Sequence, residues 1–354
     1  MRVLYFGTYE RDYPRNAQVI SCLRRAGVEV EEHHVPVWDG RRDSWRAGVG
    51  AAARLAAAEL RLLRRPGFTY DALIVGYPGH FDLPAARRAA RDRPIVFNPL
   101  VSLADTFVAD RGRFRPGSAP ARALAAVDRR AFRAADLVVA DTRAHADHLA
   151  ELVGLPHDRV EVAFVGAEDR LFAPGWSADA PFTVLFVGKL IPLHGLETIL
   201  AAARSAPELP FRLVGSGQLG ELVRTRPANV DWIPWVDYAR LPQELHRAGC
   251  ALGIFGTSAK ALRVIPNKAF QALACGTPLL TGDTPGAREL LVDGESALLV
   301  PPGDADALAH ALRRLAGDPE LARRLSAGGR AAYEAQASEG VLGRRWRSIL
   351  ERVA

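Results

Sequence analysis

Lysine is rare in this chain, and the few lysines that it has lie close together. Of 46 Lys and Arg residues only three are lysines, Lys189, Lys260 and Lys268, and they fall within one stretch of 80 residues. A chain that uses Arg wherever charge suffices keeps Lys where a compact ammonium is needed, which suits a phosphate group. We therefore expect Lys189 and Lys268 to bind an anionic ligand. The alternative is that they are ordinary surface charges.

Lys189 directly follows an expected strand, in the segment 186–190 (Phe-Val-Gly-Lys-Leu). Gly188 lets the backbone approach a ligand closely, and a helix expected to begin near Gly195 presents unbonded N–H groups. A phosphate fits such a place. The alternative is an ordinary turn with a solvated lysine.

Lys268 follows Pro266 and Asn267 at the expected start of another helix. Pro266 suits the first helical position, which leaves the N–H groups of Asn267 and Lys268 unbonded. A cation at a helix N-terminus is unfavourable unless an anion lies between them, and a diphosphate would be such an anion. Gln271 lies one turn further along, within reach of a ribose hydroxyl. The alternative is a lysine that extends along the surface into solvent.

Residues 215–220 (Gly-Ser-Gly-Gln-Leu-Gly) match the G-x-G-x-x-G pattern of dinucleotide-binding proteins. The match lies on the second strand of its half rather than on the first, where that pattern belongs. We therefore disfavour a nicotinamide-dependent dehydrogenase. The acidic pair in 304–306 (Asp-Ala-Asp) is better explained as a helix N-cap than as a metal ligand, and no metal site is expected.

In the N-terminal half, several polar residues follow expected strands, where ligands bind in parallel sheets. His80 follows the strand expected at 72–75 and is a candidate base or hydrogen-bond donor for an acceptor substrate. The alternative is a histidine packed for structural reasons. Asn98, Asp105 and the pair Asp110–Arg111 follow the next strand and are further candidates.

These candidates stand on strands and helices that alternate along the whole chain. Apolar runs typical of strands alternate with Ala-, Leu- and Arg-rich stretches typical of helices, which predicts parallel sheets covered on both faces. Pro and Gly interrupt the alternation at 166–182, and 354 residues favour two domains. We expect domains over 1–167 and 168–334, with the carboxyl ends of their sheets facing each other across a cleft. The stretch 331–354 is expected to be helical, with 335–354 packing on the N-terminal domain.

The composition is that of an ordinary globular protein, with 49% apolar and 24% charged residues. The sequence shows no run of 18 apolar residues and no signal peptide, and its three cysteines do not suggest a disulfide framework. We therefore expect a cytoplasmic protein. The net charge of +6 is too small to indicate a nucleic-acid partner, and no aromatic–basic or zinc-knuckle pattern supports one.

The motifs of the second half occur in an order and spacing that resemble a known family. They are Gly-Lys-Leu at 188–190, Leu-Val-Gly-Ser-Gly at 213–217, Ala-Leu-Ala-Cys-Gly-Thr-Pro at 272–278, Glu-Leu-Leu-Val-Asp-Gly at 289–294 and Leu-Val-Pro-Pro-Gly-Asp at 299–304. Together they resemble the C-terminal half of glycosyltransferase family 4, the retaining enzymes of GT-B fold. The first half is similar only in layout.

The resemblance implies a nucleotide-diphosphate sugar, of UDP or GDP type, bound in the C-terminal domain. It also implies transfer with retention of configuration, without a metal or a cofactor, in which Lys189 and Lys268 stabilise the leaving diphosphate. The residues implied on the donor side are Gly188, Lys189, Pro266, Asn267 and Lys268 at the diphosphate, Gly215 and Gly217 near the nucleotide, and Val236 at the base.

Three positions depart from the pattern of that family. His194 stands where the family usually has a second clamping lysine, and Arg263 and Gln271 stand in place of two glutamates. Gln271 can still bond a ribose hydroxyl, whereas Arg263 reverses the charge where the donor sugar is expected. We hypothesise that Arg263 or Lys260 binds an anionic donor sugar such as a uronic acid; the alternative is a surface arginine on a remodelled loop. A catalytically silent nucleotide-sugar-binding protein and a GT-B nucleotide-sugar epimerase stay open as alternatives.

The resemblance assigns the acceptor, a sugar or a lipid-linked or other small molecule, to the N-terminal domain. The expected contacts are Gly7, Tyr9, Arg15 and Asn16 of the loop 7–16, with His80 and Asn98, and the candidate catalytic residues there are His80 and Asp105. Residues 41–65 carry seven arginines among leucines and a tryptophan. This composition is typical of a basic amphipathic helix on an anionic membrane, the alternative being a solvated helix packed on its own sheet.

Overall fold

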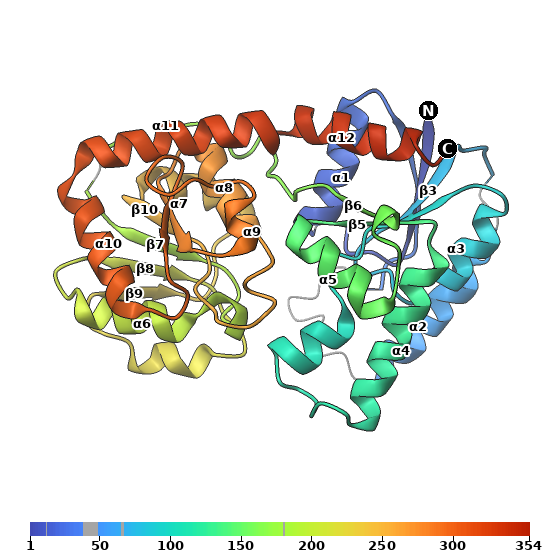
Figure 1. Cartoon of the computed structure of the whole chain (residues 1–354), viewed down its shortest axis with the longest axis horizontal. Helices are drawn as coiled ribbons and strands as arrows, with labels where there is room; N and C mark the ends of the chain where they lie inside the picture. The colour runs from blue at the N-terminus through green and yellow to red at the C-terminus, as the bar shows by residue number, and fades with distance from the viewer. Residues whose placement is uncertain (12, 38–48, 65–66, 180) are drawn as a thin grey trace. The chain divides into compact units, whose positions relative to one another are not determined.

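The computed structural model describes all residues except 12, 38–48, 65–66 and 180. The described chain divides into two compact units, each built on one six-stranded parallel sheet with helices around it (Figure 1). This confirms the predicted α/β class with two parallel sheets. Unit 1 consists of Met1–Val108, Gly112–Val165 and Glu339–Ala354, and unit 2 consists of Ala109–Arg111 and Gly166–Ser338.

The sheet of unit 1 has the strand order β2-β1-β3-β4-β5-β6, and all its neighbouring strands are parallel. Apart from the edge strand β2, these strands are almost wholly buried, as a parallel sheet covered on both faces requires. They are β1 (Arg2–Gly7), β2 (Glu29–His34), β3 (Ala72–Val75), β4 (Ile95–Phe97), β5 (Leu137–Ala140) and β6 (Val160–Val162).

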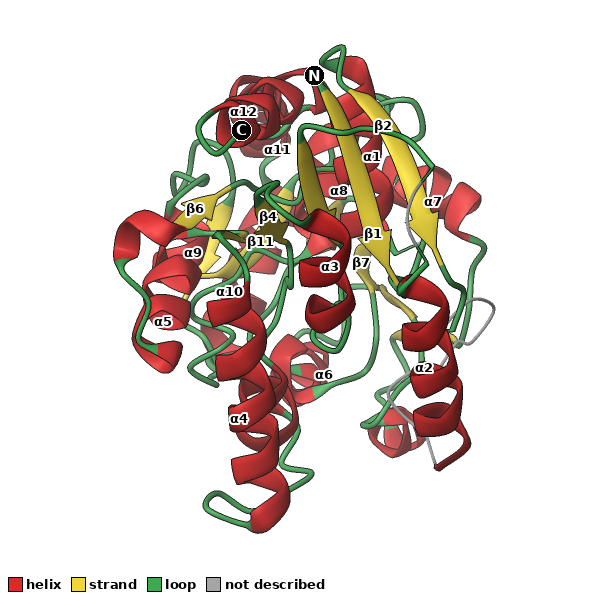
Figure 2. Ribbon diagram, turned by 90° about the vertical axis from the view of Figure 1, so that its right-hand side faces the viewer, coloured by secondary structure: helices red, strands yellow, loops and turns green. Residues whose placement is uncertain are grey.

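Helices cover both faces of this sheet (Figure 2). One apolar core lies between the sheet and two helices, α1 and the C-terminal α12, and a second lies between the opposite face and the helices α2 to α5. A π-helix, η2, covers Asp105–Asp110. The α-helices are α1 (Pro14–Arg25), α2 (Val49–Leu62), α3 (Leu83–Ala90), α4 (Ala119–Ala134), α5 (Arg143–Val153) and α12 (Glu339–Glu351).

The C-terminal helix α12 packs against α1 in unit 1, which confirms the prediction that the last helix returns to the N-terminal domain. Trp346 is fully buried in this contact, and Glu339 accepts hydrogen bonds from Ser21 and Arg25 of α1. The stretch 331–354, predicted to be helical, is helical with one interruption. The backbone at Ala337 leaves the helical conformation, so α11 ends at Gln336 before α12 begins.

The sheet of unit 2 has the order β12-β11-β10-β7-β8-β9, again parallel throughout. The order reverses between β7 and β10, and such a reversal is where ligands bind beyond the strand ends. The strands are β7 (Val184–Val187), β8 (Phe211–Val214), β9 (Val230–Ile233), β10 (Cys250–Leu252), β11 (Leu279–Gly282) and β12 (Leu298–Val300).

The helices of unit 2 surround this sheet and bury its apolar core. They are α6 (Leu196–Ser205), α7 (Leu241–Arg247), α8 (Asn267–Cys275), α9 (Pro285–Arg288), α10 (Ala305–Gly317) and α11 (Pro319–Gln336). Asp304 caps α10 by accepting a hydrogen bond from the N–H of Ala307, as predicted for this aspartate. Within the described part of the chain, no helix is both long and apolar enough to cross a membrane.

The contact between α1 and α12 leaves no room for a side chain at Gly343. A Cβ added there would lie 2.4 Å from the carbonyl oxygen of Cys22 and 3.1 Å from the Cβ of Ala26. We expect Gly343→Ala to lower the free energy of unfolding by about 1–3 kcal/mol, because α12 must move away from α1.

Gly340→Ala is the matched control, because the nearest atom to a Cβ at Gly340 is 3.8 Å away on the same helix. This change should leave stability unchanged or raise it by up to about 1 kcal/mol, since Ala favours the helix. Urea unfolding of both variants measures the difference. Equal stability of the two variants would contradict the packing argument.

Candidate functional site

Lys268 is the central polar group at the carboxyl edge of the sheet in unit 2. It stands in the first turn of α8, and its ammonium Nζ is buried with no hydrogen-bond partner among the described residues. The Nζ lies 3.7 Å from the centroid of the Phe186 ring. Burial lowers the pKa of Lys268 well below that of a solvated lysine. An ammonium held in this way is suited to an anion that enters beside it.

The helix α8 begins one residue later than the sequence predicted. Pro266 has an extended backbone and precedes the helix, and Asn267 is the first helical residue. The predicted placement of Pro266 at the first helical position is therefore wrong by one residue. Its fixed φ and missing N–H are accommodated equally well just before the helix. The start of α8 still lies beside the ammonium of Lys268, and a helix N-terminus favours anions.

The turn after β7 faces the ammonium of Lys268. A Cβ added to Gly188 would lie 2.6 Å from Lys268 Nζ and 3.2 Å from Cε1 of His194, and the φ of Gly188 is +153°. The Nδ1 of His194 donates to the carbonyl of Lys189 at 2.5 Å, while the Lys189 side chain is exposed. Burial lowers the pKa of His194, and the charge of Lys268 lowers it further. Gly188, His194 and the backbone of Lys189 thus lie next to Lys268, and their contacts with a donor stay predictions.

The glycines of the G-x-G pattern allow the turn after β8 to pack against the turn after β7. A Cβ on Gly215 would lie 1.8 Å from the carbonyl oxygen of Gly188, and a Cβ on Gly217 would lie 2.7 Å from that of Leu190. Both glycines also have positive φ. They are required because two backbone turns touch, which places Gly215 and Gly217 beside the Gly188 turn.

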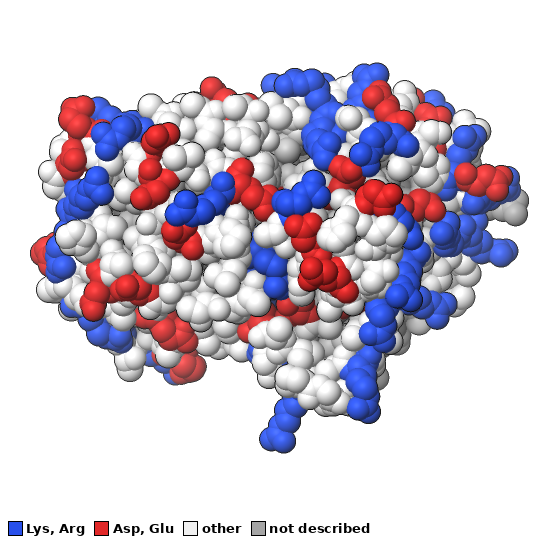
Figure 3. Space-filling model, in the orientation of Figure 1, with Lys and Arg blue, Asp and Glu red and all other residues white. Residues whose placement is uncertain are grey.

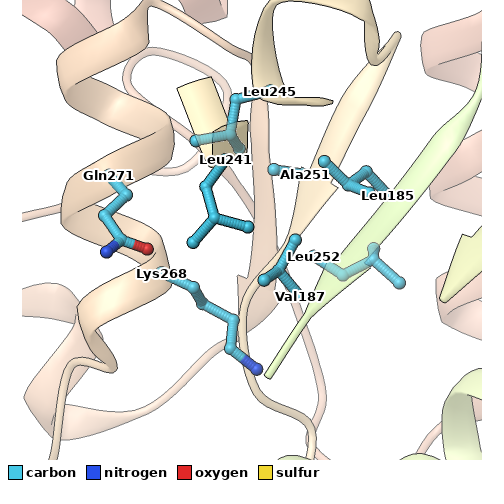
Figure 4. Close-up of a pocket in the computed structure, with 8 residues that line it drawn as sticks. All are labelled: Leu185, Val187, Leu241, Leu245, Ala251, Leu252, Lys268 and Gln271. Atoms are coloured by element: carbon cyan, nitrogen blue, oxygen red, sulfur yellow. The ribbon is translucent and has the colours of Figure 1, made fainter. Parts of the chain in front are cut away.

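A small pocket opens where β7 and β10 are neighbours, at the reversal of strand order (Figure 4). In Figure 4 the ammonium of Lys268 points toward the end of β7, and Gln271 lies one turn further along α8. The pocket is mostly apolar with two polar groups, a combination typical of small-molecule sites. It is lined by Leu185, Val187, Leu241, Leu245, Ala251, Leu252, Lys268 and Gln271.

Gln271 belongs to a short chain of hydrogen bonds that the sequence did not indicate. Its Nε2 donates to the hydroxyl of Tyr238 at 3.4 Å, and that hydroxyl donates to Glu168 at 3.2 Å. Burial raises the pKa of Tyr238, which therefore stays a neutral donor. Tyr238 orients the amide of Gln271 at the edge of the pocket.

The remaining donor-side candidates also lie in unit 2. Val236 is half-buried in the segment after β9, Lys260 is buried and Arg263 is half-buried, the last two between β10 and α8. The backbone of Arg263 packs closely against Gly286, where an added Cβ would lie 2.6 Å from the carbonyl carbon of Arg263. Their contacts with a donor stay predictions.

In unit 1 the polar residues at the carboxyl edge of the sheet bind backbone groups instead of facing solvent. Asn16 is fully buried, accepts from Tyr5 and from the N–H of Tyr77, and donates to the carbonyls of Glu10 and Tyr77. Arg15 is also fully buried. It donates to Asn98 and to the carbonyls of Ala163 and Phe164.

The structure therefore corrects the prediction that Tyr9, Arg15, Asn16 and Asn98 contact an acceptor. All four side chains are buried, and the Tyr9 hydroxyl donates to Glu32 at 2.7 Å. The physical reason is that loops folded over the strand ends bury backbone carbonyls and N–H groups, which Arg15 and Asn16 satisfy. Asn98 in turn accepts from Arg15. The sequence pattern correctly placed these residues at the carboxyl edge of the sheet, but it did not show that their side chains are buried there.

His80 is packed in the interior of unit 1. Its side chain is 1% exposed, its Nδ1 contacts the carbonyl of Pro78, and its Nε2 lies 3.3 Å from Asp128. The ring also meets the aromatic rings of Phe97 and Phe132. Burial lowers its pKa, and Asp128 opposes that shift. The structure thus supports the structural alternative and corrects the prediction of an acceptor-site base.

Asp105, the other catalytic candidate in unit 1, is buried at the start of the π-helix η2. Its backbone N–H donates to Ser102, and its carboxylate lies 4.0 Å from Nε2 of His148 on α5. This histidine side chain is partly exposed. A catalytic role for Asp105 stays a prediction.

Gly7 holds the first loop of unit 1 against a pair of carboxyl groups. Asp82 accepts from the N–H of Thr8 at 2.6 Å and from its hydroxyl at 3.0 Å, and a Cβ on Gly7 would lie 2.2 Å from Asp82. Burial and the neighbouring Asp82 carboxyl raise the pKa of Glu59 to about 9. Glu59 therefore holds a proton that it shares with Asp82. Gly7 serves this turn, and its predicted contact with an acceptor stays untested.

Part of the basic segment 41–65 lies outside the described residues, namely 41–48 and 65. The helix predicted to begin at Trp45 is described from Val49, as α2. In its C-terminal part, Ala58 and Leu62 are buried, whereas Leu60 is 70% exposed between the exposed Arg54 and Arg61. Across the residues that the structure describes, no group of three or more His, Cys, Asp or Glu side chains is arranged to hold a metal ion.

Two family descriptions match the chain, one for each half. Residues 168–332 match the family described as glycosyl transferases group 1, and residues 2–166 match the glycosyl transferase 4-like domain. Among curated proteins, a D-inositol 3-phosphate glycosyltransferase of Kribbella flavida is 28% identical over 75% of this chain and 67% of its own length. The lipopolysaccharide core biosynthesis glycosyltransferase LpsE of Rhizobium meliloti is 25% identical over 87% and 86%. Several other curated relatives are matched over 48–61% of their length.

Solved structures share the fold. Sucrose-phosphate synthase of Thermosynechococcus elongatus has a TM-score of 0.76 at 18% identity, covering 99% of this chain and 98% of its own. HepE of Anabaena, solved in complex with UDP-glucose, has a TM-score of 0.70 at 17% identity, covering 99% and 100%. At such identities the likeness concerns the fold alone.

The proton held by Glu59 makes the stability of unit 1 depend on pH. The unfolded chain releases this proton near pH 4.5 and the folded protein near pH 9, so the stabilisation is complete below about pH 4.5 and is lost as the pH rises toward 9. We expect Glu59→Gln to remove this loss, because the amide cannot ionise.

Thermal unfolding of the variant should show a higher Tm than the native chain at about pH 9, and a much smaller difference at about pH 5. The control is Glu151→Gln at an exposed position of α5, which should not change the pH profile. A Glu59→Gln variant whose Tm parallels that of the native chain at every pH would contradict the shared proton.

Proposed function

The chain belongs to glycosyltransferase family 4, the glycosyltransferases of GT-B fold, and from this premise we propose that it transfers a sugar from a nucleotide-diphosphate donor with retention of configuration and without a metal ion. The enzyme class, a glycosyltransferase, follows from the family. The observation that supports the donor site best is the buried, unpaired ammonium of Lys268 beside the Gly188 turn. An ammonium without a counter-charge is costly to bury, and a diphosphate would supply that charge.

The donor diphosphate would lie between the Gly188 turn and the first turn of α8. There it would meet the ammonium of Lys268 and the free N–H groups at the helix start, with the exposed Lys189 at its outer side. The small size of Gly188 leaves room for the phosphate oxygens. Binding would raise the pKa of Lys268, because a neighbouring anion favours the charged form of an ammonium.

In the transfer step, the bond between the anomeric carbon and the donor's phosphate oxygen breaks. The acceptor hydroxyl oxygen attacks the same face of that carbon, and its proton passes to the departing phosphate oxygen. The protein then contributes cations for the leaving group and the orientation of the two substrates, rather than a nucleophile. This assignment agrees with the burial of His80, which leaves no acceptor-side base at that position.

The nucleotide is proposed to be a uridine or guanosine diphosphate, bordered by Val236 and the exposed Trp235, with Gln271 at the ribose. HepE of Anabaena, which shares the fold, was solved with UDP-glucose and with UDP, and this supports the uridine type. The acceptor is proposed to be a sugar or a related polyol, since the curated relatives act on an inositol phosphate and on a lipopolysaccharide core.

The donor sugar itself is proposed to be anionic. Arg263 and Lys260 lie between β10 and α8, and Arg263 stands where the family pattern has a glutamate. A guanidinium there would form two parallel hydrogen bonds to the carboxylate of a uronic acid. It would therefore bind a uronic acid more tightly than a neutral hexose.

Thermal stabilisation by a panel of UDP, GDP and their sugar conjugates tests the donor proposal, since a ligand bound only by the folded state raises Tm. We expect one nucleotide series to raise Tm and the Lys268→Ala variant to lose that shift. Among the sugar conjugates we expect a preference for uronic acid donors, which Arg263→Glu should remove. No shift with any nucleotide would contradict the donor site. Binding without turnover of the donor would instead support a silent nucleotide-sugar-binding protein.

Peripheral contact with an anionic membrane is proposed for the basic side of unit 1. Exposed arginines continue beyond α2 onto α4, and in Figure 3 a row of basic side chains follows α4. Such a surface would hold the enzyme near a lipid-linked acceptor. The exposed arginines of α4 are Arg122, Arg129, Arg130 and Arg133.

Sedimentation with vesicles tests this membrane contact. We expect binding to vesicles containing anionic lipid, no binding to neutral ones, and loss of binding at about 0.5 M salt, where charges are screened within a few ångströms. Replacing Arg122, Arg129 and Arg130 by Ser should weaken the binding, whereas the same change at Arg323 and Arg324 of α11 should not. Equal recovery with neutral and anionic vesicles would remove the proposal.

A further inference from the structure

Arg111 is a basic residue of unit 2 that the proposed donor site does not yet use. The sequence grouped it with candidates of the N-terminal half, but the structure assigns Ala109–Arg111 to unit 2. It directly follows the π-helix η2, and π-helical turns occur often at functional sites. Nε and Nη1 of its guanidinium are buried, although the residue as a whole is partly exposed.

The backbone of Arg111 is hydrogen-bonded to the glycine-rich turn of the proposed donor site. Its carbonyl accepts a hydrogen bond from Nε2 of Gln218 at 3.3 Å. Gln218 follows Gly217, which packs against the carbonyl of Leu190. The main chain at Arg111 is therefore tied, through two backbone turns in contact, to the same segment that carries Gly188 and Lys189.

The guanidinium of Arg111 also lies close enough to His194 to act on it electrostatically. Burial, Lys268, Arg111 and Lys189 all lower the pKa of His194. Three basic residues thus act on the same buried imidazole. An anion of two or more charges that enters beside His194 would be attracted by all three.

We propose that Arg111 binds the diphosphate of the donor and stabilises the nucleoside diphosphate as it leaves. This inference rests on the proposed function and adds to it a contact outside the segment 183–316, where the family-like motifs lie. An Arg donates from a planar fork to two phosphate oxygens at once, whereas Lys268 offers a point charge, so the two groups are complementary. The attraction between Arg111 and the leaving group would increase as negative charge develops on the leaving group.

Binding and turnover of Arg111→Ala and Arg111→Lys test this assignment, with Arg113→Ala as the matched control. Arg113 is an exposed arginine two residues away, stacked near the rings of Phe107 and Phe114. Calorimetry would compare UDP, UMP and uridine, or the guanosine series if the native chain selects it. The thermal stability of each variant is measured alongside.

We expect Arg111→Ala to weaken diphosphate binding by about 10- to 100-fold, the effect of losing hydrogen bonds to a charged group, and to change nucleoside binding little. Its kcat should also fall, Arg111→Lys should recover part of both losses, and Arg113→Ala should behave as the native chain.

Three results would overturn the assignment. One is diphosphate binding by Arg111→Ala within twofold of the native value. Another is an equal loss of diphosphate and nucleoside binding, which a purely structural role would produce. If the native chain itself bound no nucleoside diphosphate, the proposed function would fail together with this inference, whereas native binding with an indifferent Arg111 would leave the proposed function standing.

Discussion

The burial of one ammonium group constrains the whole donor side of this protein. Lys268 lies in the first turn of α8 against the ring of Phe186, where its charge meets neither solvent nor a described hydrogen-bond acceptor. Burying an unpaired charge costs several kcal/mol, and this burial lowers the pKa of Lys268 well below that of a solvated lysine. The fold keeps it in place because α8 is otherwise almost entirely buried and cannot turn the lysine outward.

The glycines of unit 2 are the second part of the same arrangement. Two turns after β7 and β8 touch through their backbones, and a side chain at Gly215 or Gly217 would prevent that contact. Their closeness holds Gly188 next to the ammonium of Lys268, where a side chain in place of Gly188 would meet that ammonium. The site is therefore built from backbone packing at a reversal of strand order, with few side chains, as is usual for open parallel sheets.

Sequence reasoning found the elements and the donor-side cluster more reliably than it found the orientation of polar side chains. The strand ends follow from residue types and spacing, whereas the pairing of Gly188 with Lys268 is implied by the resemblance to the family. The same reasoning placed Arg15 and His80 on an acceptor surface, but both are buried. A polar residue after a strand serves equally well to bind a ligand or to satisfy loop carbonyls, and only the path of the following loop decides between them. That path is a tertiary property, as is the helix break at Ala337 and the position of Arg111.

The unusual scarcity of lysine allows the central claim to be measured directly. Protein labelled with ¹³C and ¹⁵N at lysine alone would show three side chains by NMR, which substitution of each lysine assigns. The account predicts that Lys268 titrates well below its ordinary pKa of 10.5 and that a nucleoside diphosphate raises this pKa and shifts its signal. Three lysines that all titrate near 10.5, with no response of Lys268 to UDP or GDP, would contradict the account.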